Sequence, residues 1–235
     1  MFMILDIYPR QSMSEDVSTL GTFYISMKKT TLKTLLSLVA MATLASISPA
    51  MAQAGKVTAT DPKFDTIQSP MFGGNTGQKS WKPKDWLEAE VKFRVEMPKS
   101  YKQHFVDTVT VRWYVAADNP AGKGYVLLEK EVTHVNVPVG EDMHSSVYLS
   151  PSAIKRLTGK DRARGAISYI GGEIMVNGTS LESNKERYFS SKGKPGWWRS
   201  GGLSRYDAIP LLNKNETPFA LLWWDRYAEI KAERR

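Results

Sequence analysis

The sequence predicts a mainly β protein, built as a sandwich or barrel of short antiparallel strands behind an export signal. Apolar and polar residues alternate over several segments, which is the pattern of strands with one face in a core and one face in water. Turn residues separate these segments at about the 8–12-residue spacing that is typical of all-β domains. A basic segment, an apolar stretch and a small-residue triplet follow one another near the N-terminus, which predicts secretion.

The export signal extends from the basic segment at Met27 to the Ala-Met-Ala triplet that ends at Ala52. Its apolar stretch covers residues 35–47 and is shorter than the about 20 residues that span a bilayer. We therefore expect cleavage between Ala52 and Gln53, and no retained anchor. The alternative is a buried core helix.

The chain divides into four parts by composition. Residues 1–26 contain three acidic side chains, which are out of place at the front of a signal peptide, so we expect translation to start at Met27. We assign residues 27–52 to the signal peptide, residues 53–83 to an extended arm or edge strand, and residues 84–235 to a β-sandwich domain.

The composition of residues 53–235 fits one exported domain. These residues keep 28 Lys and Arg and 21 Asp and Glu, a net charge of +7, because the leader holds four basic and three acidic side chains. The basic residues are spread along the chain, so we expect no nucleic-acid partner. The chain has no cysteine, which excludes disulfides and lipid attachment, and its mature part contains no apolar run of membrane-spanning length.

The arm at residues 53–83 is rich in Pro, Gly, Lys and polar residues, with a few apolar side chains that we expect to dock on a surface. Phe64, Met71 and Phe72 are therefore candidate interface residues. An extended chain pairs readily with a free sheet edge, so the arm is expected to add as a strand to a neighbouring subunit.

The strongest strand pattern lies at residues 85–96, where five apolar residues alternate with charged ones. An Asn-Gly pair at 177–178 predicts a hairpin. Ser150, Pro151 and Gly159 are placed to begin and end one short helix. A helix and uneven strand lengths disfavour the rival reading, an outer-membrane barrel. The other strands are expected at residues 108–117, 125–137, 145–149, 166–176, 179–189 and 217–224.

The sequence contains no recognisable catalytic, metal or cofactor motif, so we expect a non-enzymatic protein. The histidines lie far apart along the chain, and the Gly-x-Ser-x-Gly nucleophile pattern is absent. Gly171-Gly172 lacks the spacing of a phosphate loop and predicts a bulge or strand break. Glu88 and Glu90 share one strand face, which would suggest a glycosidase pair only in a cleft; a solvated, charge-mixed face is the preferred interpretation.

Tryptophans provide the candidate ligand or interface residues. Trp197 and Trp198 lie in a Gly- and Lys-rich loop, where exposed rings stack on sugars or anchor protein interfaces. The competing interpretation is that one or both rings cover the open end of the sandwich. Trp223 and Trp224 would end the last strand with one ring inward and one outward.

Several segments resemble the pilus-like protein family of mucin-degrading verrucomicrobial gut bacteria. The resemblance covers nearly the whole mature chain. It implies an immunoglobulin-like fold, association with type IV pilus-like genes and oligomers formed by strand exchange, and it carries no catalytic residues. The segments that carry it are Ser-Pro-Met-Phe-Gly-Gly-Asn at 69–75, the stretch from Trp81 to Phe93, Arg-Trp-Tyr-Val at 112–115 and Gly-Lys-Pro-Gly-Trp-Trp-Arg at 193–199.

The signal departs from that of a type IV pilin, because Pro49 and the Ala-Met-Ala triplet end the apolar stretch that a pilin would retain. We therefore predict an exported, non-enzymatic, pilus-associated or cell-surface structural or interaction protein, located in the periplasm, on the outer surface or in the medium. Its expected partners are further copies of itself or pilus-related proteins. The alternative is a glycan-binding, mucin-adhesion module.

Overall fold

The computed structural model describes residues 55–71, 82–181 and 184–232, all within one compact unit, Met51–Arg235. The predicted signal peptide, its cleavage site at Ala52 and Gln53, and Phe72 lie outside the described residues. No helix among the described residues is long and apolar enough to cross a membrane.

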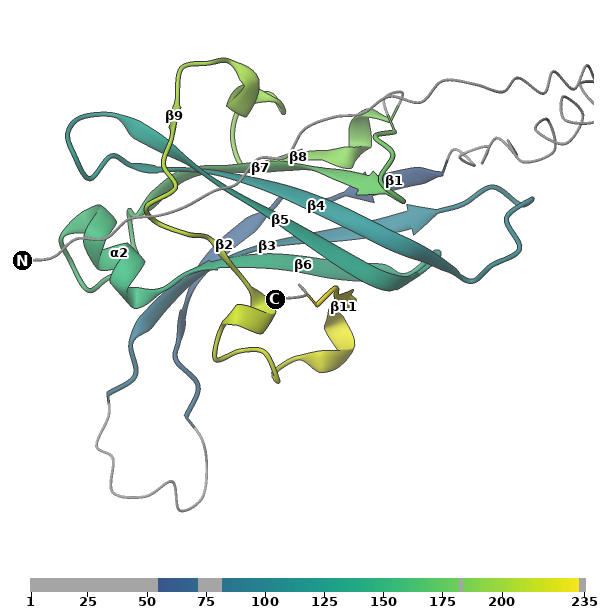
Figure 1. Ribbon diagram of the computed structural model, residues 1–235, viewed down its shortest axis with the longest axis horizontal. Coiled ribbons are helices and arrows are strands. Elements are labelled where there is room, and N and C mark those ends of the chain that lie inside the picture. The colour runs from purple at the N-terminus through teal and green to yellow at the C-terminus, as the bar shows by residue number, and fades with distance from the viewer. Residues whose placement is uncertain (1–54, 72–81, 182–183, 233–235) are drawn as a thin grey trace, which may run out of the picture. The chain divides into compact units, whose positions relative to one another are not determined.

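Two sheets form the fold (Figure 1). All pairings in both sheets are antiparallel except the parallel pairing of β9 with β5. The first sheet contains β1 (Lys56–Ala59), β2 (Lys63–Gln68), β3 (Asp85–Glu96), β6 (Asp142–Leu149) and β10 (Leu212–Asn213). The second contains β11 (Glu229–Ile230), β5 (Tyr125–Pro138), β4 (Phe105–Asp118), β7 (Ile167–Val176), β8 (Tyr188–Ser190) and β9 (Ser204–Arg205).

The strand order is that of an immunoglobulin-like sandwich. In the first sheet, β1 and β2 lie end to end along β3, which pairs with β6, and this is the A-B-E order of that fold. In the second sheet, the order β5-β4-β7-β8 corresponds to C′-C-F-G. The predicted antiparallel β-sandwich with one short helix is confirmed.

The core lies between the two sheets and is centred on Trp113 of β4, which is fully buried. Its ring packs against Phe189 of β8 at 5.0 Å, and its indole N–H donates to Ser145 Oγ at 3.3 Å. A buried tryptophan on strand C is typical of immunoglobulin domains, where it covers a disulfide. Here the chain has no cysteine, and aromatic and aliphatic packing replaces that bond.

Helix α2 (Pro151–Thr158) closes one end of the sandwich, as Figure 1 shows. Ser150 accepts a hydrogen bond from the Ala153 amide, Pro151 occupies the first turn, and Gly159 ends the helix in the left-handed conformation. Ile154 and Leu157 point into the core. The predicted helix and both of its end signals are therefore confirmed.

Two predicted strands are wrong. The described residues of 179–189 include a turn of 3₁₀ helix at Lys185–Arg187, and β8 begins at Tyr188. The turn at Asn177 and Gly178 is closed by an antiparallel bridge between Val176 and Thr179, and β8 returns antiparallel to β7, so the turn is confirmed and the long second strand is not. Residues 217–224 form successive turns. Gly171 and Gly172 do not break β7, because both pair with strands on either side, and the register shift of β7 lies opposite Ala116 and Ala117.

His134 of β5 is fully buried beside Phe93, with ring centroids 6.1 Å apart. Its Nδ1 lies 3.1 Å from the Ala228 carbonyl oxygen, which only accepts, so this nitrogen carries the proton of the neutral ring. Burial lowers the pKa of His134 to about 4, and the bond to Ala228 opposes that shift. The ring is therefore neutral in the folded protein at pH 7.

We expect His134 to make the sandwich less stable in acid. The unfolded chain takes up a proton at this ring below about pH 6.5, whereas the folded chain does so only near pH 4. Stability should therefore fall as the pH is lowered through this window, by about 3 kcal/mol. Urea unfolding of the wild type and of His134→Leu at pH 4–7 measures this; the variant should lose the part of the slope that His134 contributes, and the exposed-site control His104→Leu should keep the wild-type slope.

Candidate interaction surfaces

The C-terminal segment, residues 214–228, lies on the outer face of the first sheet between β10 and β11 (Figure 1). Phe219 anchors it and is only 1% exposed. Its ring stacks on Tyr148 of β6 at 5.4 Å and meets Trp86 of β3 edge-on at 5.6 Å. These three rings form a second, smaller hydrophobic cluster outside the main core.

A polar cluster lies beside these rings, under the same segment. Tyr148 donates to Glu88 Oε1 at 2.6 Å, and Arg226 bonds Glu90 Oε1 at 2.6 Å. Tyr227 donates to the other oxygen of Glu90. Burial, the largest cause, raises the pKa of Glu88, and the hydrogen bond from Tyr148 opposes the rise.

The interpretation of this strand face as solvated is therefore wrong at Glu88 and Glu90. Both carboxylates are partly buried, and their oxygens are used by Tyr148, Tyr227 and Arg226. Only Lys92 and Arg94, paired with Asp142, remain as a half-exposed charged ladder further along β3. The two glutamates are placed to hold the C-terminal segment on the sheet, not to flank a substrate.

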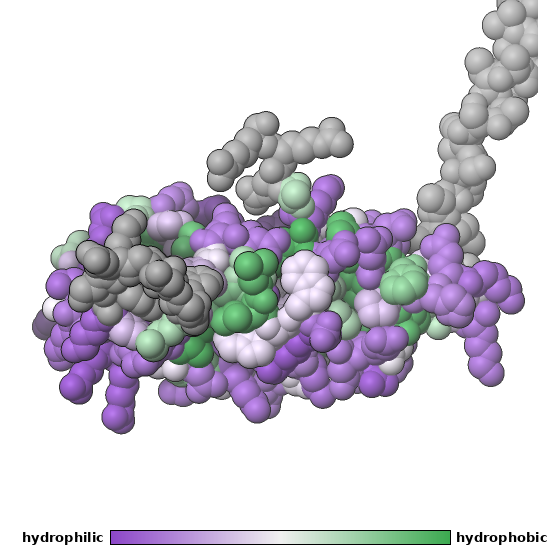
Figure 2. Space-filling view, turned by 90° about the horizontal axis from the view of Figure 1, so that it is seen from below, coloured by the Kyte–Doolittle hydropathy of each residue, from purple (hydrophilic) through white to green (hydrophobic). Residues whose placement is uncertain are grey.

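An exposed hydrophobic patch projects from the C-terminal segment. Leu221, Trp223 and Trp224 are 79%, 49% and 67% exposed. Figure 2 shows hydrophobic side chains in the middle of an otherwise hydrophilic face on this side of the molecule. The prediction that a strand directs one tryptophan inward and one outward is wrong because the segment is not a strand; Trp224 is mostly exposed, and Trp223 is half-exposed with its ring stacked on Phe219. Trp223 also has a left-handed backbone, with φ of 53°, which is unusual for a bulky residue.

The described arm residues form the edge of the first sheet. β1 and β2 pair with β3 from Lys56 opposite Glu96 to Gln68 opposite Asp85. Phe64 is 44% exposed, and Met71, just beyond β2, is 75% exposed. The arm thus places two apolar side chains in solvent close to the sheet edge.

Trp197 and Trp198 lie on the outer face of the second sheet, not at an open end of the sandwich. The Trp198 ring stacks on Tyr114 at 4.8 Å and 11°, and it is only 8% exposed. It lies over Gly171, where any side chain would collide with it. Trp197 is half-buried and donates to Ser190 Oγ at 3.2 Å. The two rings are therefore packed against the sheet and do not form an exposed platform.

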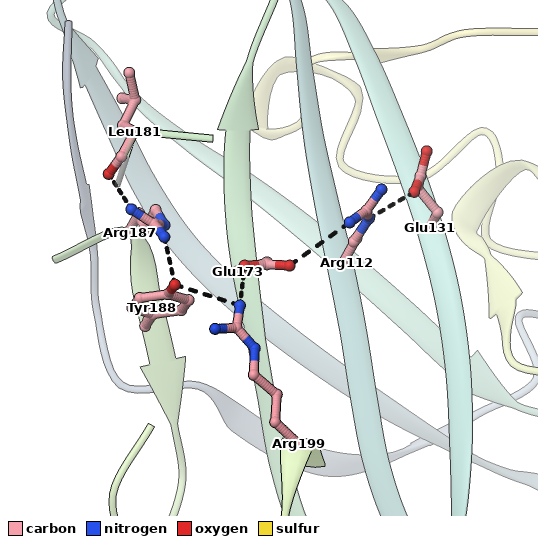
Figure 3. A network of polar contacts seen from close by, with 7 residues as sticks. All are labelled: Arg112, Glu131, Glu173, Leu181, Arg187, Tyr188 and Arg199. Atoms are coloured by element: carbon pink, nitrogen blue, oxygen red, sulfur yellow. Dashed lines mark hydrogen bonds and ion pairs between the residues drawn. The ribbon is translucent and has the colours of Figure 1, made fainter. Parts of the chain in front are cut away.

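An ionic network fixes the loop that carries Trp198 (Figure 3). Glu173 of β7 is buried and bonds Arg199 at 2.7 Å, and it lies 3.7 Å from Arg112 of β4. Arg112 also bonds Glu131 of β5 at 2.9 Å. Arg187 reaches the Leu181 carbonyl oxygen and the Tyr188 hydroxyl. A chain of alternating charges thus crosses β5, β4 and β7 and ends on Arg199 in the loop.

No group of three or more His, Asp or Glu side chains in the described part of the chain is arranged to hold a metal ion. His134 is buried in the sandwich, His144 stands beside Tyr227, and His104 is exposed. The sequence pattern does not single out the polar face around Tyr114, although Arg112, Tyr114 and Glu129 all occupy outward positions of the predicted strands.

Comparison with known proteins places the chain in a family. A protein-family model matches residues 48–234. A crystal structure of a protein from Akkermansia muciniphila matches with 36% sequence identity and a TM-score of 0.68, over 77% of this chain and 94% of that chain. The chain belongs to the family of this Akkermansia muciniphila protein. No curated protein matches the chain.

Family membership confirms the part of the resemblance that concerns lineage and fold. The match spans the sandwich, so the immunoglobulin-like architecture is shared with the Akkermansia muciniphila protein. The pilus association that the resemblance implies belongs with the function proposed below.

Proposed function

We propose that this protein is a non-enzymatic, exported structural or interaction protein of the cell surface, associated with pilus-like assemblies, that joins copies through its N-terminal arm. The observation that carries the proposal is the way the arm is held. Five of the six residues of β2 are exposed, so this strand stays on the sheet mainly through main-chain hydrogen bonds to β3.

Such bonds do not depend on which copy supplies the strand. The same register between β2 and β3 can form within one chain or between two chains. In a closed symmetric oligomer each copy receives the arm of another copy, so every β3 edge remains paired. Val57 of β1 is fully buried, and it would occupy the same core position in either arrangement. Strand exchange therefore costs little interaction energy, and linker geometry and concentration decide between the two forms.

The exposed patch of Leu221, Trp223 and Trp224 supplies a second contact for the same role. Tryptophan is enriched at the energetic centres of protein interfaces, and these rings are held out by a short turn on a sheet-anchored segment. The segment that carries the patch is docked on the outer face of the first sheet, and the arm forms the edge of that sheet. Both surfaces would therefore serve an assembly on one side of the sandwich.

An engineered disulfide tests the exchange directly, because the chain contains no cysteine of its own. Lys56 and Glu96 are exposed and lie opposite each other in the pairing of β1 and β3. After oxidation of Lys56→Cys/Glu96→Cys, covalent dimers or larger species on a non-reducing gel support exchange, and the two single variants control for surface cross-linking. A disulfide formed only within single chains contradicts it.

Size measurement on residues 53–235, with and without residues 53–80, provides the second test. An assembly held by the arm should fall to monomers when the arm is removed. A monomer in both forms would rule out arm exchange.

A further inference from the structure

The outer face of the second sheet carries a groove of about 480 Å³ that the assembly role does not use. Arg112 and Tyr114 line it from β4, Glu129 and Glu131 from β5, and Arg205 from β9. The groove lies on the opposite sheet from the arm and from the exposed tryptophans, so its function is independent of the proposal above.

One face of the Tyr114 ring borders this groove. Tyr114 pairs with Gly171 of β7 on one side and with Glu129 of β5 on the other. Trp198 lies over Gly171 and stacks on the ring from the β7 side. The opposite ring face therefore looks toward β5 and Arg205, where the groove runs.

The ring is held in place before any ligand arrives. Trp198 is buried, and Arg199, the next residue, is bound to the buried Glu173 at 2.7 Å (Figure 3). Gly171 leaves the space that the indole fills. A rigid aromatic surface loses little conformational entropy on binding, which favours recognition.

The polar walls of the groove are balanced in charge. Arg112 pairs with Glu131 at 2.9 Å, and Arg205 pairs with Glu129 at 3.3 Å. Each guanidinium keeps further donors, each carboxylate keeps further acceptor positions, and the Tyr114 hydroxyl has no hydrogen-bond partner among the described residues. Donors and acceptors thus alternate around an aromatic surface, and the two Arg–Glu pairs carry no net charge between them, while Lys130, which also lines the groove, is paired with Glu216.

We propose that this groove binds a neutral hexose unit of a glycan chain. A pyranose ring presents C–H groups on one face, which pack on an aromatic ring, and hydroxyls at its edge, which both donate and accept hydrogen bonds. Tyr114 supplies the aromatic face, and the two Arg–Glu pairs supply the matching partners. An anionic sugar would meet Glu129 and Glu131, and a basic ligand would meet Arg112 and Arg205, so neutral units are preferred.

Trp198 makes the binding measurable. Its indole is in contact with Tyr114, so a sugar on the far face of that ring should change the tryptophan emission. The probes are lactose, N-acetyllactosamine, tri-N-acetylchitotriose and maltotriose as neutral sugars, and 3′-sialyllactose and a mixed-charge peptide as charged competitors. Saturable emission changes with at least one neutral sugar, and weaker or no response to the charged probes, support the proposal.

Variants locate the site. Tyr114→Leu removes the stacking face, and Glu129→Gln and Arg205→Ala each remove one hydrogen-bonding wall; each should weaken binding by about tenfold or more. Glu129 and Arg205 are at the surface, so these two variants decide the result if Tyr114→Leu does not fold. The control Arg94→Ala changes a half-exposed arginine on the other sheet and should leave binding unchanged. No response to any neutral sugar, binding that survives all three groove variants, or preference for sialyllactose or peptide overturns the proposal.

Discussion

Replacing Gly172 with alanine is expected to destabilise the sandwich by about 3 kcal/mol or more, because the added methyl group has no room. Gly172 of β7 lies between strands β4 and β8, and a Cβ there would collide with the Phe189 ring and with the backbone carbonyl of Arg112. A side chain can rotate away, but the carbonyl oxygen belongs to the central strand of the sheet. The strands themselves would have to separate.

Chemical denaturation of Gly172→Ala, followed by circular dichroism, measures this loss. Gly122→Ala is the matched control, because no atom lies within 4 Å of the position where its Cβ would be placed and its backbone is not left-handed. The control should change the free energy of unfolding by less than about 0.5 kcal/mol. Equal stability of the two variants would show that Phe189 and β4 can move apart without cost.

Gly171→Ala tests the outer face of the same strand, whereas Gly172→Ala tests its core face. Its Cβ would meet the Trp198 ring on the outer face, where a loop can yield, and not a backbone atom. We expect a smaller destabilisation than at Gly172, of about 1–2 kcal/mol, together with a red-shifted tryptophan emission as Trp198 is displaced. A blue shift or unchanged emission would contradict the placement of Trp198 over this glycine.

Sequence periodicity predicted the strands whose two faces differ. The alternation at residues 85–96 matches β3 to the residue, because every second residue from Leu87 to Val95 faces the core and the residues between them lie on the other face. The helix at 151–158 could also be predicted, because Ser150, Pro151 and Gly159 set its ends through contacts with residues nearby in the sequence. These features are determined by residues close together in the sequence, so the sequence alone is enough to predict them.

The sequence could not show the features that depend on distant segments. Residues 219–224 are apolar without a period, and such a run predicts a buried strand. In the structure the run divides between Phe219, which is buried, and Leu221 and Trp224, which are exposed. The partial burial of Glu88 arises from Tyr148 and Tyr227, which come from other parts of the chain.

The candidate sites also depend on contacts between distant segments. Trp198 stood out in the sequence as a tryptophan in a glycine-rich loop, but its burial depends on a gap at Gly171 that no local pattern marks. Tyr114 was visible only as one polar position of a strand. Its proposed role in the groove requires Trp198 on one side and Glu129 on the other; strand pairing places Glu129, and the folding of a distant loop places Trp198.

Replacing Phe219 with alanine is expected to release the C-terminal segment from the first sheet. Phe219 is 1% exposed and contacts Trp86 and Tyr148, so truncation removes about 3–5 kcal/mol of packing. The polar contacts beneath the segment depend on its position, because Arg226 and Tyr227 reach Glu90 only while the segment is docked. Loss of the aromatic anchor should therefore open the segment before the main core unfolds.

Trypsin digestion distinguishes this local opening from global unfolding. Lys214 is buried and donates to the Ala220 carbonyl oxygen at 2.9 Å, so the wild type should resist cleavage there. Phe219→Ala should be cut after Lys214 under conditions where the rest of the sandwich stays intact, because Phe219 packs on the outer face of β3 and β6 and not in the main core between the sheets. The control Trp224→Ala removes a 67% exposed ring from the same segment and should leave cleavage unchanged. Equal resistance of Phe219→Ala and wild type would mean that Glu88, Glu90 and their partners hold the segment without its aromatic anchor.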